Sequence, residues 1–193
     1  ATPADIPLMQ CFLDQQGSSK QFFPHYNLQK LADQSDFFRG LQPSDFWLAF
    51  SGNQLLGLTG LWDQKSFKQT RIVDYSPGLK LLRHGYNLNN FVRGGPTLPA
   101  PGGQMKYLTL HSIALKDNSP ELFQALFSTI YAHFGSRYDA LVCGFFENDP
   151  LSKVLKPFRG QRLRSQHFLL SYQGDPRLSL DSERTAYAEI ARL

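Results

Sequence analysis

Cysteine is scarce in this chain, which has two cysteines, Cys11 and Cys143, among 193 residues. They do not form a Cys-x-x-Cys pair, neither has an obvious histidine partner, and both lie in apolar stretches of sequence. We therefore expect two buried, reduced thiols and no metal site. Reduced thiols in turn point to a cytoplasmic location.

Long apolar runs are missing as well. The sequence has no run of about 18 apolar residues that would span a membrane, and no charged-then-apolar leader opens it. We expect no membrane partner. Because Ala1 stands where a translated chain would carry Met, we interpret the sequence as a processed or excised piece.

The excess of positive charge is small. The chain has 20 Lys and Arg against 16 Asp and Glu, a formal charge of +4 and a pI of about 9.1, without long charged runs. This balance suits a phosphorylated small ligand and does not by itself indicate nucleic acid. With 41% hydrophobic residues and no internal repeat, residues 1–193 are expected to form one domain, either alone or within a longer protein.

The apolar periodicity predicts alternating helices and strands. Thr2 and Pro3 are typical of a helix start, as are Ser119 and Pro120, while residues 93–103 hold four Gly and three Pro and predict a loop. The predicted elements are helices at 3–17 and 27–32, a hairpin of strands at 46–50 and 54–62, a helix at 77–92, a strand at 105–115, a helix at 119–134, a strand at 138–146, a short helix at 150–156, and strands at 162–172 and 185–190.

Three segments resemble motifs of the GNAT N-acyltransferase superfamily, in the family's order. The opening ATPADIP resembles the motif that follows the first strand in many members. The hairpin FWLAFSGNQLLGLTGLW resembles the second and third strands. The run ENDPLSKVLKPFRGQRLRSQHF resembles the stretch from the fifth to the sixth strand.

The resemblance implies an α/β (α+β) fold with a GNAT-like, mixed, mostly antiparallel sheet flanked by helices. The sheet would be splayed between the family's fourth and fifth strands, here 105–115 and 138–146. Acetyl-CoA or another acyl-CoA would lie in this gap, with its pantetheine amides bonded to the backbone of Ile113, Ala114 and Leu115. The acceptor would be a small-molecule or peptide amine. The family's first strand would be missing, which leaves an edge open to a homodimer or a neighbouring domain.

The sequence departs from the family where the CoA diphosphate would bind. The family has a glycine-rich turn at this point, whereas residues 116–123 contain no glycine and Pro120 lacks an N–H donor. Lys116, Asn118 and Ser119 would have to bind the phosphates instead. We favour the simpler interpretation, in which Ser119 and Pro120 start an ordinary helix.

Glu147 and His111 are the candidate catalytic residues. In the family a carboxylate or a water-linked base deprotonates the amine and a tyrosine protonates the departing thiolate, but Leu155 occupies the tyrosine position here. Glu147 follows a predicted strand and is placed to act as a base, although a capping or solvated carboxylate explains it more simply. His111 would titrate near neutral pH, although a structural role explains it more simply.

Asn148 and Lys153 are candidate cofactor contacts. Asn148 matches an amide of the family motif that would bond the pantetheine arm, and a turn role before Asp149 explains it equally well. Lys153 would meet the CoA 3′-phosphate, although a solvated basic face is the more common outcome. It opens a basic stretch formed by Lys153, Lys156, Arg159, Arg162 and Arg164.

Aromatic and polar residues near the hairpin are candidate acceptor contacts. Large rings give a pocket area and shape, while core packing or a solvated hairpin explains the same residues without a ligand. The candidates are Phe23, Tyr26, Trp62, Asp63 and Gln64.

Two functions therefore remain open. The first is an acyl-CoA-dependent N-acyltransferase that acts on an unknown amine. The second is a catalytically degenerate GNAT-fold module with an interaction or regulatory role, which is favoured by the missing glycines and by Leu155.

Overall fold

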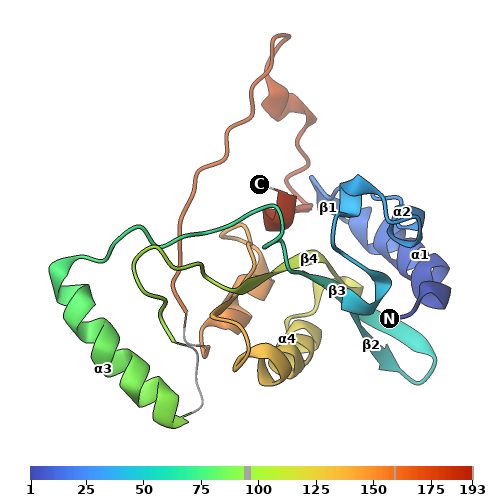
Figure 1. Cartoon of the computed structure of the whole chain (residues 1–193). Coiled ribbons are helices and arrows are strands. Elements are labelled where there is room, and N and C mark those ends of the chain that lie inside the picture. The colour runs from blue at the N-terminus through green and yellow to red at the C-terminus, as the bar shows by residue number, and fades with distance from the viewer. Residues whose placement is uncertain (94–96, 159, 193) are drawn as a thin grey trace.

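A computed structural model describes residues 1–93, 97–158 and 160–192. Its main sheet has four strands in the order β2-β3-β4-β5 (Figure 1). The strands are β2 (Phe46–Ser51), β3 (Gln54–Trp62), β4 (Tyr107–Leu115) and β5 (Ala140–Val142). β2 with β3 and β3 with β4 pair antiparallel, and β4 with β5 pair parallel. The predicted mixed, mostly antiparallel sheet with flanking helices is confirmed.

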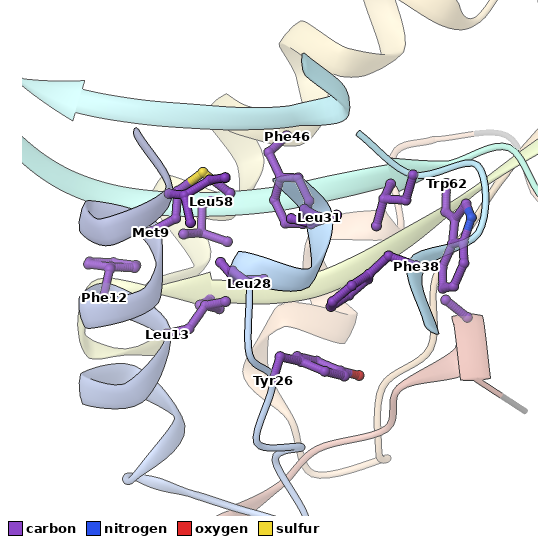
Figure 2. Close-up of a cluster of buried hydrophobic side chains, with 14 of the residues drawn as sticks. Met9, Phe12, Leu13, Tyr26, Leu28, Leu31, Phe38, Phe46, Leu58 and Trp62 are labelled. Atoms are coloured by element: carbon purple, nitrogen blue, oxygen red, sulfur yellow. The ribbon is translucent and has the colours of Figure 1, made fainter. Parts of the chain in front are cut away.

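The hairpin was predicted almost to the residue. Its turn contains Gly52 with a positive φ of 56°, a conformation that glycine adopts without steric penalty. β3 is buried along most of its length, since one face of the sheet packs against α1 (Ile6–Gly17) and α2 (Gln29–Ala32). Figure 2 shows this core, in which Met9, Leu28 and Leu58 meet between α1, α2 and the strands.

The helix α4 (Pro120–Phe134) belongs to a second hydrophobic cluster, with Leu61, Leu110 and Leu115 from the strands. It starts where the sequence predicts, because the Ser119 hydroxyl accepts from the N–H of Leu122 at 3.2 Å and Pro120 has no N–H to satisfy. Its buried residues are Phe123, Leu126, Phe127 and Ile130, spaced as one helix face requires.

An arm formed by residues 70–93 and 97–105 leaves the sheet between β3 and β4 and carries α3 (Pro77–Arg93), as predicted for 77–92 (Figure 1). Backbone bonds between Ile72 and residues 102 and 103 hold the base of the arm together. Exposed apolar side chains, among them Leu81 and Phe91, remain on α3. In the predicted loop at 93–103, residues 94–96 lie outside the described residues. None of the described helices is long and apolar enough to cross a membrane.

The strands predicted after α4 are shorter than expected, and one does not form. β5 covers three residues of the predicted 138–146, and β6 (Thr185–Ala186) covers two of 185–190 and pairs with β1 (Lys20–Gln21). Residues 162–172 form no strand. They belong to an exposed loop that runs away from the sheet and returns to it (Figure 1), so no neighbouring backbone satisfies their polar groups as a sheet would.

The two cysteines differ from the expectation. Cys143 is largely enclosed, and burial raises the pKa of its thiol to about 12. Cys11 is exposed on α1, so the prediction that it is buried was wrong. Its neighbours Met9, Phe12 and Leu13 are the ones that face the core.

A bulge in β4 separates it from β5. In the pairing with β3, Leu58 stands opposite Ala114 and Gly60 stands opposite His111, so β4 has one more residue than β3 between these pairs. Within this bulge, Ser112 has a positive φ of 53°. Pairing with β5 ends at Thr109 opposite Val142, although β4 continues to Leu115. Beyond this point residues 187–192, here named the returning segment, bond to the edge of β4.

Gly144 allows the returning segment to approach closely. A Cβ atom at Gly144 would overlap the side chain of Ile190. We therefore expect Gly144→Ala to force the segment outward and to lower the free energy of unfolding by about 1–3 kcal/mol, as overpacking does. Urea titration measures the change.

Gly160→Ala is the matched control, because nothing lies within 4 Å of a Cβ there. Equal stability of both variants would show that Ile190 does not pack on Gly144.

Candidate functional site

Two consecutive backbone N–H groups at the β4 bulge bond to side chains of the returning segment. The N–H of Ser112 donates to Oε2 of Glu189 at 2.8 Å, and the N–H of Ile113 donates to the hydroxyl of Tyr187 at 3.0 Å. The same Tyr187 hydroxyl donates to Glu189 Oε2 at 3.0 Å. Of these two donors, Ile113 was expected to bond the pantetheine, and in the structure it bonds the chain's own Tyr187 instead.

The cluster around these donors contains several buried ionisable groups. Lys20 is 3% exposed, its Nζ donates to the carbonyl of Ile113 at 3.5 Å, and burial lowers its pKa to about 8. Burial raises the pKa of Glu189 and of Tyr187, and the neighbouring Glu189 carboxylate raises that of Tyr187 further. Groups perturbed in this way are typical of functional sites, although structural networks perturb them as well.

His111 is fully buried in the same cluster. Its Nδ1 shares a hydrogen bond of 2.7 Å with the Ser112 hydroxyl, and its Nε2 has no partner among the described residues. Burial, and next the nearby Arg192 cation, lower its pKa to about 3, so the imidazole is neutral at physiological pH. The ring lies 4.9 Å from the Tyr26 ring and 5.3 Å from the Trp62 ring, between centroids.

Four aromatic rings surround the guanidinium of Arg192. Measured from its Cζ to the ring centroids, the distances are 3.9 Å to Phe37, 4.7 Å to Trp62, 5.1 Å to Phe38 and 5.5 Å to Tyr26. We call these four residues the aromatic cage. Figure 2 shows Tyr26, Phe38 and Trp62 at one end of the core, beside the last turn of the chain. Rings at these distances attract a cation through their quadrupoles.

Of the expected acceptor residues, three come together at the cage. Tyr26 and Trp62 supply rings, and Nε2 of Gln64 donates to the carbonyl of Ala191 at 2.8 Å. Phe23 is not part of the cage; its ring packs on that of Tyr187, with 4.6 Å between the centroids. Asp63 points elsewhere, since it is exposed and accepts from the N–H of Lys65.

In the segment that was expected to bind phosphate, Ser119 and Asn118 already make hydrogen bonds within the protein. Ser119 caps α4 and its hydroxyl donates to Glu121 at 2.7 Å. Asn118 donates to Asp149 at 3.2 Å, and Lys116 is half-buried just after β4. The favoured interpretation of Ser119 as an ordinary helix cap is therefore confirmed. Asn118 is half-buried beside this cap.

The predicted residues after β5 lie apart from the cage. Glu147 and Asn148 are exposed, and Asp149 rather than either of them caps the 3-10 helix Pro150–Leu155, accepting from the N–H of Leu151 at 3.0 Å. Lys153 is exposed on that helix, as a solvated basic face would be. Arg159 of the basic stretch lies outside the described residues.

Ala114 and Leu115, which were expected to bond the pantetheine with Ile113, stand opposite Leu58 and Gly57 in the sheet register. The bulge instead makes Ser112 and Ile113 the pair whose N–H groups bond outside the sheet. Ser112 was not among the expected residues. Its position in the middle of a predicted strand gave no sign of a bulge.

Sequence reasoning also missed Arg192, Tyr187, Glu189, Lys20 and the Phe37-Phe38 pair. The one signal for them was the predicted strand at 185–190, in which Tyr187 and Glu189 share a face. No group of three His, Cys, Asp or Glu side chains gathers as metal ligands within the described part of the chain. Two surface hollows, of about 540 and 280 Å³, lie away from the cage.

No known protein family, curated protein or solved structure matches the chain. The candidate site therefore rests on its own geometry, which combines two outward N–H donors, a neutral histidine and an aromatic cage.

The buried His111 predicts how stability depends on pH. Its folded pKa of about 3 lies below the ordinary histidine value of 6.5, so from pH 6.5 down to 3 the unfolded chain binds a proton at this residue that the folded chain does not. Stability is therefore lost as pH falls through this window, by up to about 1.4 kcal/mol per pH unit. We expect the stability advantage of the wild type over His111→Gln to shrink between pH 7 and pH 5, measured by urea titration.

His25→Gln is the control, because His25 is exposed. A stability difference between wild type and His111→Gln that stays constant over this pH range would contradict the neutral, buried assignment.

Proposed function

We propose that this chain is an acyl-CoA-dependent N-acyltransferase with a GNAT-like arrangement of its sheet. The observation that carries the proposal is the pair of N–H donors at Ser112 and Ile113, located where β4 parts from β5. Two adjacent donors at a fixed bulge can stabilise the oxyanion that forms when an amine attacks a thioester carbonyl. Acyl-CoA would supply the acyl group.

The donors are available only when the returning segment has moved away. Glu189 and Tyr187 occupy them in the structure described here, so catalysis requires an open state in which the carbonyl oxygen of the thioester replaces these two side chains. The neutral amine of the acceptor then attacks the carbonyl carbon, a C–N bond forms, the C–S bond breaks, and the thiolate leaves. The amine proton goes to a base.

His111 and Glu147 are the candidates for that base. His111 has a buried Nε2 without a partner among the described residues, but its pKa of about 3 makes it a weak base and its ring is fully buried. Glu147 is exposed, which favours access to an acceptor that arrives from solvent. Lys116 and Lys153 remain the available cations for CoA phosphates, since no glycine turn cradles them.

A second candidate function is a non-catalytic module of the same fold. The self-capped start of α4 favours it, because Ser119 bonds Glu121 and the N–H of Leu122, Asn118 bonds Asp149, and no glycine turn is present for a diphosphate. Leu155 favours it too, since it packs against the cluster around α4 and cannot donate a proton.

Acyl-CoA binding separates the two functions. We expect saturable binding of acetyl-CoA or a longer acyl-CoA in calorimetric titration, and weaker binding when Lys116 and Lys153 are both changed to Gln, because two phosphate contacts are lost. Lys80→Gln on α3 is the matched control for removal of a lysine. Absence of binding at millimolar acetyl-CoA and longer acyl-CoAs would leave the non-catalytic module.

Glu147→Gln tests the exposed base. If Glu147 removes the amine proton, kcat falls about 100-fold or more while the affinity for acyl-CoA stays unchanged, because the carboxylate acts in the transition state. Steady-state kinetics with an accepted amine, together with the acyl-CoA titration, measures both quantities. An unchanged kcat would remove Glu147 from the mechanism and leave His111.

A further inference from the structure

The contacts of Arg192 do not resemble those of an ordinary structural arginine. Its Nη1 donates to the carbonyl of Phe37 at 2.6 Å, whereas its Nε and Nη2 are buried and have no partner among the described residues. Arginine in a structural pair usually forks onto a carboxylate. The close ion pairs found among the described residues involve other side chains, so Arg192 is held by the rings of the cage together with its interactions with the Tyr26 hydroxyl and the more distant Glu189 carboxylate.

Two further buried polar atoms without a partner belong to residues near Arg192. Nε2 of His111 and Oε1 of Gln64 are buried without a partner in the described part of the chain, and the other end of the Gln64 amide bonds Ala191, the neighbour of Arg192. Buried polar atoms in native structures are rarely left unpaired. A cluster that leaves both donors and acceptors unpaired fits its present occupant imperfectly.

The cage is connected to the N–H donors through one carboxylate. The Tyr26 hydroxyl lies 3.4 Å from Glu189 Oε2, and the same oxygen accepts from the N–H of Ser112 at 2.8 Å. A ligand whose cation occupies the cage would therefore place its remaining atoms toward the β4 bulge.

The returning segment is attached in a way that permits exchange. It follows an exposed loop, and its backbone anchor in the sheet is the two-residue pairing of β6 with β1 plus the bond from the N–H of Tyr187 to Gln21 at 2.8 Å. Withdrawal of residues 187–192 would leave α1, α4 and the four-stranded sheet in place. The cage would then be open to solvent from the side that Arg192 now covers.

We propose that the aromatic cage binds the guanidinium or alkylammonium group of the acceptor, and that Arg192 occupies it as an internal competitor while the returning segment is docked. The acceptor is therefore an amine that carries a second, cationic group. The identification of the ligand as the acceptor rests on the proposed acyltransferase function, whereas cation binding by the cage does not.

Fluorescence of Trp62 tests the cage directly. In a Trp47→Phe background, Trp62 is the one remaining tryptophan of the chain. The probes are N-acetylarginine methylamide and the neutral N-acetylcitrulline methylamide, which have nearly the same shape. In Arg192→Ala we expect saturable quenching by the charged probe, at least about tenfold tighter than by the neutral probe and tighter than in the Arg192 chain.

A second substitution assigns the binding to the cage. Phe37→Ala in the Arg192→Ala chain is expected to weaken the charged probe about tenfold, because the ring closest to the cation is lost. Phe50→Ala, a change of an exposed ring near the hairpin turn, is the control. Equal affinity for the two probes, or no saturation with either, would overturn the proposal.

Hydrogen exchange on the unmodified chain gives a test that does not depend on the folding of a variant. The charged probe is expected to speed exchange in residues 185–192 and the neutral probe is not. Unchanged exchange with both probes would show that Arg192 is a permanent structural clamp. Cation binding without acyl-CoA turnover would support the cage as a cation site and reject the acyltransferase function. Turnover without preference for cationic amines would support the acyltransferase function and reject the cage as the acceptor site.

Discussion

Two backbone N–H groups of β4, those of Ser112 and Ile113, need hydrogen-bond partners, and the position of the returning segment depends on this need. The N–H groups of Ser112 and Ile113 at the bulge bond outside the sheet, and on the β5 side no strand of the described residues pairs with β4 beyond Thr109. Buried donors without acceptors are strongly disfavoured. Glu189 and Tyr187 meet this need from more than 70 residues along the chain, and their arrival brings Ile190 onto Gly144 and Arg192 into the cage.

The elements that the sequence predicted well are those whose signals are local. The hairpin has its turn glycine, and α4 has its hydroxyl cap, its proline and a regular apolar face. The strand predictions failed where partners had to come from afar. Residues 162–172 have the composition of a strand but no neighbouring strand, and 138–146 pairs for three residues because the bulge carries β4 away.

The candidate site was predictable in part for the same reason. Tyr26 and Trp62 were expected to line a pocket because large rings give it area and shape, and Gln64 because it follows a central strand; the two rings do face Arg192, and Gln64 bonds the neighbouring Ala191. His111 was expected on the polar side of a half-buried strand, but helices cover both faces of β4 and the ring is fully buried. A cage built from residues 26, 37, 38 and 62 around residue 192 depends on tertiary packing that no local pattern contains.

The same contacts that complete the sheet edge also set the conditions for any ligand. Each hydrogen bond from the bulge contributes about 1 kcal/mol net, and the cation in the cage adds about 1–2 kcal/mol where it is desolvated. If a ligand must replace the returning segment, its apparent Kd equals its intrinsic Kd divided by the fraction of molecules in which the segment is undocked. Since every 1.4 kcal/mol changes that fraction about tenfold, roughly 3 kcal/mol of docking would weaken apparent binding more than a hundredfold. A carbonyl bound at the bulge and a cation bound in the cage would together offset this penalty, because each replaces a lost contact with one of the same kind.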